Sequence, residues 1–87
     1  MKIIKKDGRV EKFDINKIKN TVSKASDEAK IPLTEGDLAS LCRAIESKLK
    51  SMNKDITSSY EVFGLIIIML KQEGFSKVAD GYCKGAY

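Results

Sequence analysis

The sequence has 87 residues, 43% of them hydrophobic, which is enough for one small globular domain spanning residues 1–87. Its net charge of +4 lies within residues 1–20, where seven Lys and Arg face three Asp and Glu, and this asymmetry predicts an anionic partner. The absence of histidine excludes His-based catalysis and His metal sites, and the two distant cysteines exclude a CxxC zinc half-site. The two cysteines are more typical of a reduced, cytoplasmic domain, and the charged residues after Met1 do not form a secretion signal. We expect no membrane span, because the longest apolar run has only six residues.

The chain opens with a predicted β-hairpin. Lys2–Lys6 forms a strand centred on Ile3 and Ile4, and Val10–Phe13 alternates apolar and charged residues. Asp7-Gly8 between them is a two-residue turn signal, because glycine tolerates a positive φ. Since a hairpin of this size is not stable alone, we expect helices to pack on one of its faces.

The first predicted helix begins after Asp14, a typical N-cap residue. From Ile15 onward the apolar residues recur at spacings of three and four, which is the period of a helix with one buried face. Ile31-Pro32 is expected to end this helix, because the residue before a proline disfavours helical geometry.

The second predicted helix begins after Thr34, with Asp37 as the other member of a capping box, and ends near Asn53. Its apolar stripe includes Cys42, which we interpret as a small core residue. The segment Asp55–Thr57 is long enough for one short strand, distant in sequence from the hairpin.

The third predicted helix starts at a second capping box, formed by Ser58 and Glu61, and stops at Gly74. It is apolar nearly all round, so we expect it to be the central and most buried helix. A weaker last helix runs from Ser76 to about Lys84. Together the elements predict an α+β domain with four helices and three short strands.

Basic side chains gather where the first strand, the turn and the first helix meet. Lys5 and Lys6 precede the turn and Lys17 lies in the first turn of the helix, an arrangement typical of phosphate sites. Glu11 and Asp14 lie among them and are suited to accept hydrogen bonds from a ribose or a base, which favours a nucleotide over inorganic phosphate. The alternative, which composition alone favours, is a solvated hairpin whose charges pair across its strands.

The order of these residues resembles the ATP-cone family. Ile3–Ile18 is similar to the family's opening, which has an apolar residue, a basic pair, Asp-Gly, then Glu and Lys-Ile. Ile56–Glu61 resembles its short third strand and the start of its third helix, and Gly74–Ala79 with Tyr82 resembles its closing segment. The resemblance covers essentially the whole chain and implies a four-helix bundle capped by a small three-stranded mixed β-sheet. It also implies reversible binding of ATP or dATP, with or without magnesium, as an allosteric signal.

Carried over position by position, the resemblance implies a nucleotide site made of one apolar residue, a basic pair, three polar residues and a threonine: Ile3, Lys5, Lys6, Glu11, Asp14, Lys17 and Thr57. The basic pair matches residues that hold phosphates, and the polar residues match those that line the base and sugar. Asp14 stands where some members have Asn, so an amide donor is missing. Lys84 is the only candidate for a basic residue that usually follows the last helix. The other basic residues of the first quarter are expected at the solvated surface: Lys2, Arg9, Lys12 and Lys19.

The resemblance further implies regulation without catalysis, and no residue is assigned to catalysis or to a metal. ATP cones lie at the N-terminus of many ribonucleotide reductases, and Met1 at the family's usual start favours such a domain over a free-standing cone. The expected partners are a reductase catalytic domain or another cone in a nucleotide-dependent oligomer. A small basic nucleic-acid-binding or transcription-regulator domain is the alternative, although the sequence shows no recognition helix with a row of Arg or Asn. A third reading, a dimerisation module, predicts oligomers that are indifferent to nucleotide.

Overall fold

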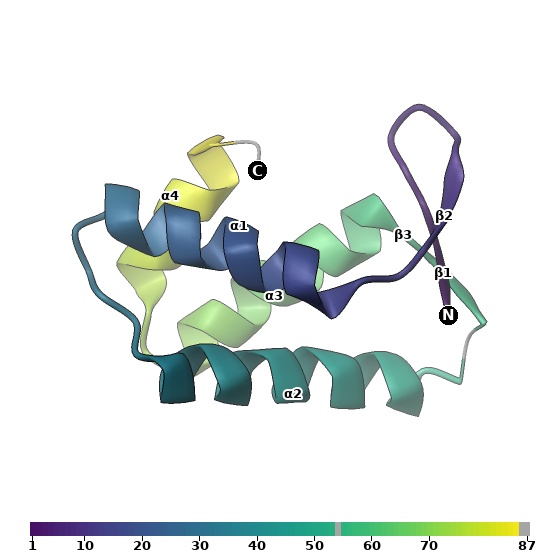
Figure 1. Cartoon of the computed structure of the whole chain (residues 1–87). Coiled ribbons are helices and arrows are strands. Elements are labelled where there is room, and N and C mark those ends of the chain that lie inside the picture. Colours follow the sequence, from purple (N-terminus) through teal and green to yellow (C-terminus); the bar gives the residue numbers. More distant parts are fainter. Residues whose placement is uncertain (54, 86–87) are drawn as a thin grey trace.

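A small sheet closes one end of a layer of helices (Figure 1). The computed structural model describes residues 1–53 and 55–85. In chain order the elements are β1 (Lys2–Ile4), β2 (Val10–Lys12), α1 (Ile15–Glu28), α2 (Glu35–Ser51), β3 (Ile56–Ser58), α3 (Ser59–Gln72) and α4 (Ser76–Gly85). Within the described residues the predicted α+β class, with four helices and a three-stranded mixed sheet, is therefore confirmed.

The sheet presents one face to the helices. β1 is its central strand and pairs antiparallel with β2 and parallel with β3. The register places Ile3 opposite both Glu11 and Thr57, and residues directly opposite one another share a face. Ile3 and Thr57 are buried there, whereas Ile4 on the alternate face is exposed. Each strand thus directs one residue of the predicted site toward the helices.

The connection within the hairpin is longer than the predicted two-residue turn. The backbone N–H of Lys5 donates to the carbonyl of Arg9 at 2.7 Å, and Gly8 N–H donates to the carbonyl of Lys5 at 2.9 Å, which leaves three residues between Lys5 and Arg9. Gly8 adopts a φ of 89°, the left-handed conformation that such a turn requires at its last position. Because the turn takes these residues, β1 ends at Ile4.

The helix starts follow the predicted caps. The Asp14 carboxylate accepts a hydrogen bond from the backbone N–H of Asn16 at 3.0 Å. Thr34 and Asp37 exchange both hydrogen bonds of their capping box at 3.0 Å each. At α3 the Ser58 hydroxyl accepts from the backbone N–H of Glu61 at 3.1 Å, but only this half of the predicted capping box forms, since the Glu61 carboxylate bonds the Thr57 hydroxyl. Since capping uses only neighbouring residues, these boundaries are visible in the sequence.

The end of α1 differs from the prediction, because the helix stops before Ile31-Pro32. Lys30 adopts a φ of 58°, and Ile31 N–H donates to the carbonyl of Ser26 at 3.0 Å. This is a Schellman motif, which satisfies the last carbonyls of the helix before the proline is reached. α3 ends in the same way at Gly74, as predicted, with a φ of 88°.

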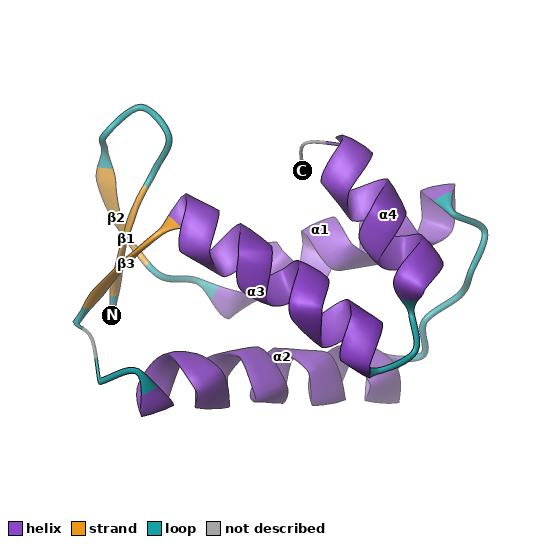
Figure 2. Ribbon diagram, turned by 180° about the vertical axis from the view of Figure 1, so that it is seen from behind, coloured by secondary structure: helices purple, strands orange, loops and turns teal. Residues whose placement is uncertain are grey.

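The core lies between the four helices, and the largest of its fully buried side chains among the described residues are Val22, Ile45, Ile66, Leu70 and Val78. α3 packs against α2, α4 and β3, which confirms its central position. It is not buried all round, however, because Tyr60 and Ile68 on it are exposed. Figure 2 shows α3 in the foreground of the opposite view. In the part of the chain that the structure describes, no helix is long and apolar enough to cross a membrane.

Candidate functional site

A cavity of about 420 Å³ lies between the hairpin, α1, α3 and α4. Its volume is in the range of sites that hold small molecules and cofactors. The apolar and aromatic lining comprises Ile3, Phe13, Ile18, Tyr60, Val62, Phe63, Ile66 and Tyr82. The polar lining comprises Lys5, Lys6, Lys12, Asp14, Lys17, Thr21, Ser59 and Cys83.

The cavity has two chemically different ends. Its four lysines come from the hairpin and from the first turn of α1. Phe63 and Ile66 come from the middle of α3, and Tyr82 comes from α4. A ligand lying along the cavity therefore meets cations at the hairpin end and apolar rings at the helical end.

Five of the seven predicted site residues line this cavity, namely Ile3, Lys5, Lys6, Asp14 and Lys17. Glu11 and Thr57 do not line it, although both lie on the inner face of the sheet beside Ile3. Lys12 was expected only at the solvated surface; it is exposed and also lines the cavity.

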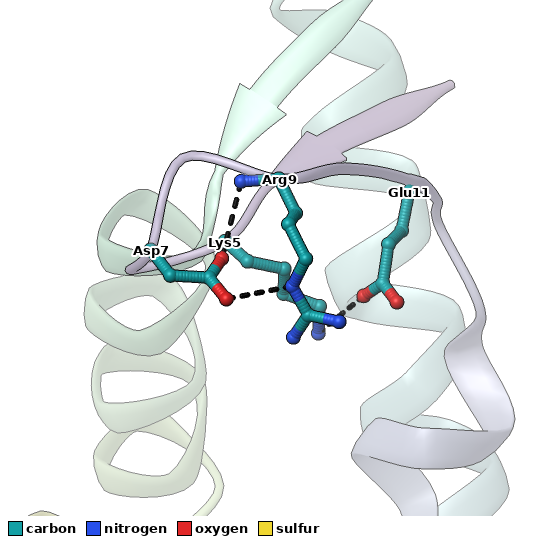
Figure 3. Close-up of polar contacts among 4 residues, drawn as sticks. All are labelled: Lys5, Asp7, Arg9 and Glu11. Atoms are coloured by element: carbon teal, nitrogen blue, oxygen red, sulfur yellow. Dashed lines mark hydrogen bonds and ion pairs between the residues drawn. The ribbon is translucent and has the colours of Figure 1, made fainter.

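Glu11 is connected to the cavity through Lys5. The Lys5 Nζ lies 3.6 Å from a carboxylate oxygen of Glu11, and about a third of each side chain is exposed (Figure 3). This ion pair crosses the hairpin, as the alternative interpretation of the charge pattern predicts. A phosphate bound at Lys5 competes with the Glu11 carboxylate for the same ammonium group.

Asp7 and Arg9 hold the turn. The Asp7 carboxylate accepts hydrogen bonds from the backbone N–H of Arg9 at 3.1 Å and from its Nε at 2.6 Å (Figure 3). These hydrogen bonds hold the pKa of the Asp7 carboxyl below its usual value, and the bond from the Arg9 backbone has the largest effect. Neither residue lines the cavity, so both act on the shape of the hairpin.

Thr57 is connected to the first turn of α3. It is only 4% exposed, and its hydroxyl donates a hydrogen bond of 2.6 Å to Oε1 of Glu61. From the sequence, Glu61 had a sufficient role in the helix cap and was not placed among the site residues. The signal that could have revealed the pair is their spacing, because Thr57 on the inner face of the strand is four residues before Glu61.

The apolar end is built by residues that sequence reasoning did not place in the site. The rings of Phe63 and Tyr82 have centroids 5.5 Å apart, in a tilted arrangement. The Tyr82 hydroxyl lies 3.1 Å from Oγ1 of Thr21, within hydrogen-bond distance. Burial raises the pKa of the Tyr82 hydroxyl, and the hydrogen bond with Thr21 opposes this in part. No local motif joins α1, α3 and α4, so this wall was not visible in the sequence.

Ser59 brings an unsatisfied polar atom to the cavity wall. Its Oγ is buried and has no hydrogen-bond partner among the described residues. Ser59 lines the cavity at the start of α3. Buried polar groups are normally paired, so an orphan hydroxyl beside a cavity indicates a group that a ligand is able to satisfy.

The comparisons with known proteins identify the family of the chain. A family model described as "ATP cone domain" matches residues 1–84. A search of curated proteins found no match.

Proposed function

The chain belongs to the ATP-cone family of nucleotide-binding regulatory domains, and we propose that it binds ATP or dATP reversibly in the cavity between the hairpin and α3. The observation that carries the proposal is the two-ended cavity, with lysines at the hairpin and aromatic rings at the helices. A nucleoside triphosphate has the matching pattern, with a multiply charged chain at one end and a flat, largely apolar base at the other.

The lysine end holds the phosphates. Among the described residues, Lys5 is the only one of the four cavity lysines with an ion-pair partner, so Lys6 and Lys17 offer ammonium groups to a ligand, whereas Lys12 shares the outer face of the sheet with Val10. Charge-assisted hydrogen bonds from ammonium groups to phosphate oxygens are among the stronger polar contacts in proteins. Magnesium bound to the nucleotide supplies partial neutralisation of the triphosphate, and the lysines supply the rest.

The apolar end holds the base. Phe63 and Tyr82 offer ring surface, and Ile3 closes the cavity from the sheet. The unpaired Ser59 hydroxyl and the Asp14 carboxylate are the polar groups of the lining suited to bond the sugar or the base. Glu11 and Thr57 act from behind the lining, Glu11 by competing with phosphate for the Lys5 ammonium group and Thr57 by positioning Glu61.

In this proposal the bound nucleotide acts as an allosteric signal. ATP and dATP differ by one hydroxyl, so they switch a protein only if each favours a different arrangement of the domain and its partner. The family's usual role supports two forms of this signal, both in the cytoplasm. In one, the domain controls the activity of a ribonucleotide reductase catalytic domain; in the other, it associates with other cones. We propose no catalytic step, because hydrolysis would consume the signal.

Calorimetric titration of the chain with ATP and dATP tests the proposal. We expect saturable heat for both nucleotides and an upward shift of the melting temperature at millimolar nucleotide. No heat and no stabilisation at that concentration would overturn it. DNA binding at low salt that ATP does not compete would favour the nucleic-acid alternative.

A further inference from the structure

The outer face of the sheet is apolar, basic and uncovered in the part of the chain that the structure describes. Ile4, Val10 and Ile56 on this face are 38%, 53% and 43% exposed. The register sets Ile4 opposite Val10. It also sets Lys2 opposite both Lys12 and Ile56. The helices pack against the other face, and Figure 1 shows them to one side of the strands. We call Lys2, Ile4, Val10, Lys12 and Ile56 the outer sheet face.

Two lysines without an ion-pair partner mark this face. Lys2 and Lys12 lie directly opposite each other, and like charges in that position repel. Neither lysine forms an ion pair with another described residue. The carboxylate nearest to them along β2 belongs to Glu11, which lies on the inner face and pairs with Lys5. The lysine pair is therefore complementary in charge to a carboxylate that this sheet does not supply.

We propose that the outer sheet face docks an acidic segment of a partner protein, in which one carboxylate bridges Lys2 and Lys12 and one apolar side chain covers Ile4 and Val10. The lysine pair and the apolar pair lie two residues apart along each strand, a distance of about 7 Å. Two residues of an extended segment that are separated by one other residue have the same spacing and point to the same side. The docked segment therefore presents an acidic and an apolar residue at that spacing.

The charge and the apolar area together select this kind of partner. Two copies of the chain that met through the outer sheet face would bring four lysines together without a carboxylate. A nucleic acid would place hydrated phosphates against the three exposed apolar side chains, and two lysines supply few phosphate contacts. An acidic and partly apolar protein segment matches both kinds of side chain.

The contact is small, so the docking is weak and exchanges rapidly. The three strands span about 10 Å across the sheet, and their three residues span about 7 Å along it. This area is far below that of a stable protein–protein interface. Ile3, which lies between Lys2 and Ile4 in β1, lines the cavity, so the docked segment lies on the reverse of a strand of the proposed nucleotide site. The docking needs no nucleotide, and its failure is therefore distinguishable from a failure of nucleotide binding.

Titration of the nucleotide-free chain with the capped peptide Ser-Glu-Thr-Val-Ser, up to millimolar peptide and followed by NMR, tests the proposal. We expect dose-dependent shifts of the backbone amide signals at Lys2, Ile4 and Val10. A peptide with glutamine in place of the glutamate should give much smaller shifts. No shift on the outer sheet face, or equal shifts with the two peptides, would overturn the proposal. Shifts confined to cavity residues such as Lys6 would also overturn it, as would tighter binding of a DNA oligonucleotide or of phosphatidylserine vesicles to this face.

A charge reversal at Lys2 separates docking from folding. Lys2→Glu changes the repulsive pair into an attractive one, so we expect the melting temperature to rise by about 1–5 °C while peptide binding weakens about fivefold or more. Lys77→Glu makes the same change in total charge at an exposed position on α4 and should leave peptide binding nearly unchanged. Equal weakening in the two variants would mean that only net charge attracts the peptide.

The apolar half of the contact has its own pair of variants. Val10→Ser should weaken peptide binding, because it removes an apolar side chain from the outer sheet face. Ile68→Ser removes an apolar side chain that is also 53% exposed, but on α3, and should leave binding unchanged. Unchanged binding by Val10→Ser would contradict the proposed contact.

Discussion

The hydroxyl of Thr57 donates a hydrogen bond of 2.6 Å to the carboxylate of Glu61 and so connects the inner face of β3 to the first turn of α3. Thr57 also lies beside Ile3 in the parallel pair of strands, and Ile3 lines the cavity. One side chain thereby joins the sheet, the central helix and the wall of the proposed nucleotide site.

Replacing this threonine tests the strength of the connection. Thr57→Val keeps the shape of the side chain but removes the donor, so we expect it to lower the free energy of unfolding by about 1–3 kcal/mol, the usual range for a buried bond to a charged group. Urea denaturation measures the change. Ser51→Ala is the control, because its exposed hydroxyl bonds only a nearby carbonyl of its own helix. A Thr57→Val chain as stable as the unmodified one would show that the bond contributes nothing.

The buried hydroxyl of Tyr82 predicts a loss of stability in alkaline solution. Burial raises the pKa of Tyr82, and an acid whose pKa is higher in the folded state contributes stability below its unfolded pKa of about 10, which is lost as the pH rises above it. Tyr82→Phe has no such proton, so its free energy of unfolding should fall less steeply above pH 10. Tyr60→Phe, at a 68% exposed position, should keep the unmodified slope. Denaturation series from pH 8 to pH 11 compare them, and identical slopes in all three chains would contradict the expectation.

The proposed phosphate end predicts a specific effect of Lys6. Lys6→Gln removes an ammonium group that lines the cavity, and we expect the ATP dissociation constant to rise about tenfold, equivalent to about 1.4 kcal/mol. Lys48→Gln makes the same change in total charge on the exposed surface of α2 and should leave binding nearly unchanged. Calorimetry measures both. Equal weakening would mean that binding depends on net charge and not on this cavity.

The ion pair between Lys5 and Glu11 predicts competition with phosphate. Because the Glu11 carboxylate lies 3.6 Å from the Lys5 ammonium, Glu11→Gln should strengthen binding of tripolyphosphate about two- to fivefold, in keeping with a partly exposed pair. Glu73→Gln, at the exposed C-cap of α3, removes the same charge away from the cavity and should have no effect. Titration of each variant with tripolyphosphate distinguishes them, and weaker binding by Glu11→Gln would refute the competition.

The hairpin turn depends on one glycine. Gly8→Ala places a side chain at a φ of 89°, where an L-residue is strained, so we expect a loss of about 1–2 kcal/mol in the free energy of unfolding. Gly36→Ala in α2 is the matched change: the new Cβ meets its nearest atom at an ordinary 3.6 Å, and alanine favours the helix. Thermal denaturation should show opposite shifts. A neutral Gly8→Ala would mean that the turn relaxes to another form.

Much of the fold was predictable because its signals are local. The caps at Asp14 and Thr34, and the stop at Gly74, depend on residues within one turn of the helix. The turn length was mispredicted because Gly8 is compatible with more than one hairpin turn, and only the backbone hydrogen bonds select between them. The end of α1 was mispredicted because a Schellman motif and a proline both lie there. At Lys30 a Schellman motif ended the helix before the proline did.

The candidate site divides in the same way. The lysines were predictable because the first strand, the turn and the start of the first helix follow one another directly in the chain, and Lys5, Lys6 and Lys17 do line one cavity. The opposite wall was not predictable, because Phe63 and Tyr82 reach the cavity only after α4 packs against both α1 and α3.

By itself, the sequence determined the four helices, the hairpin and the gathering of positive charge at the start of the chain, since periodicity, capping and charge are properties of neighbouring residues. Only the tertiary structure decided which of those lysines face a ligand, which aromatic rings lie across from them and which side of α3 stays uncovered. Those relationships join residues far apart in the chain, and packing alone sets them. The charge asymmetry thus indicated an anionic partner, and the folded cavity gave that partner a shape with one charged and one apolar end.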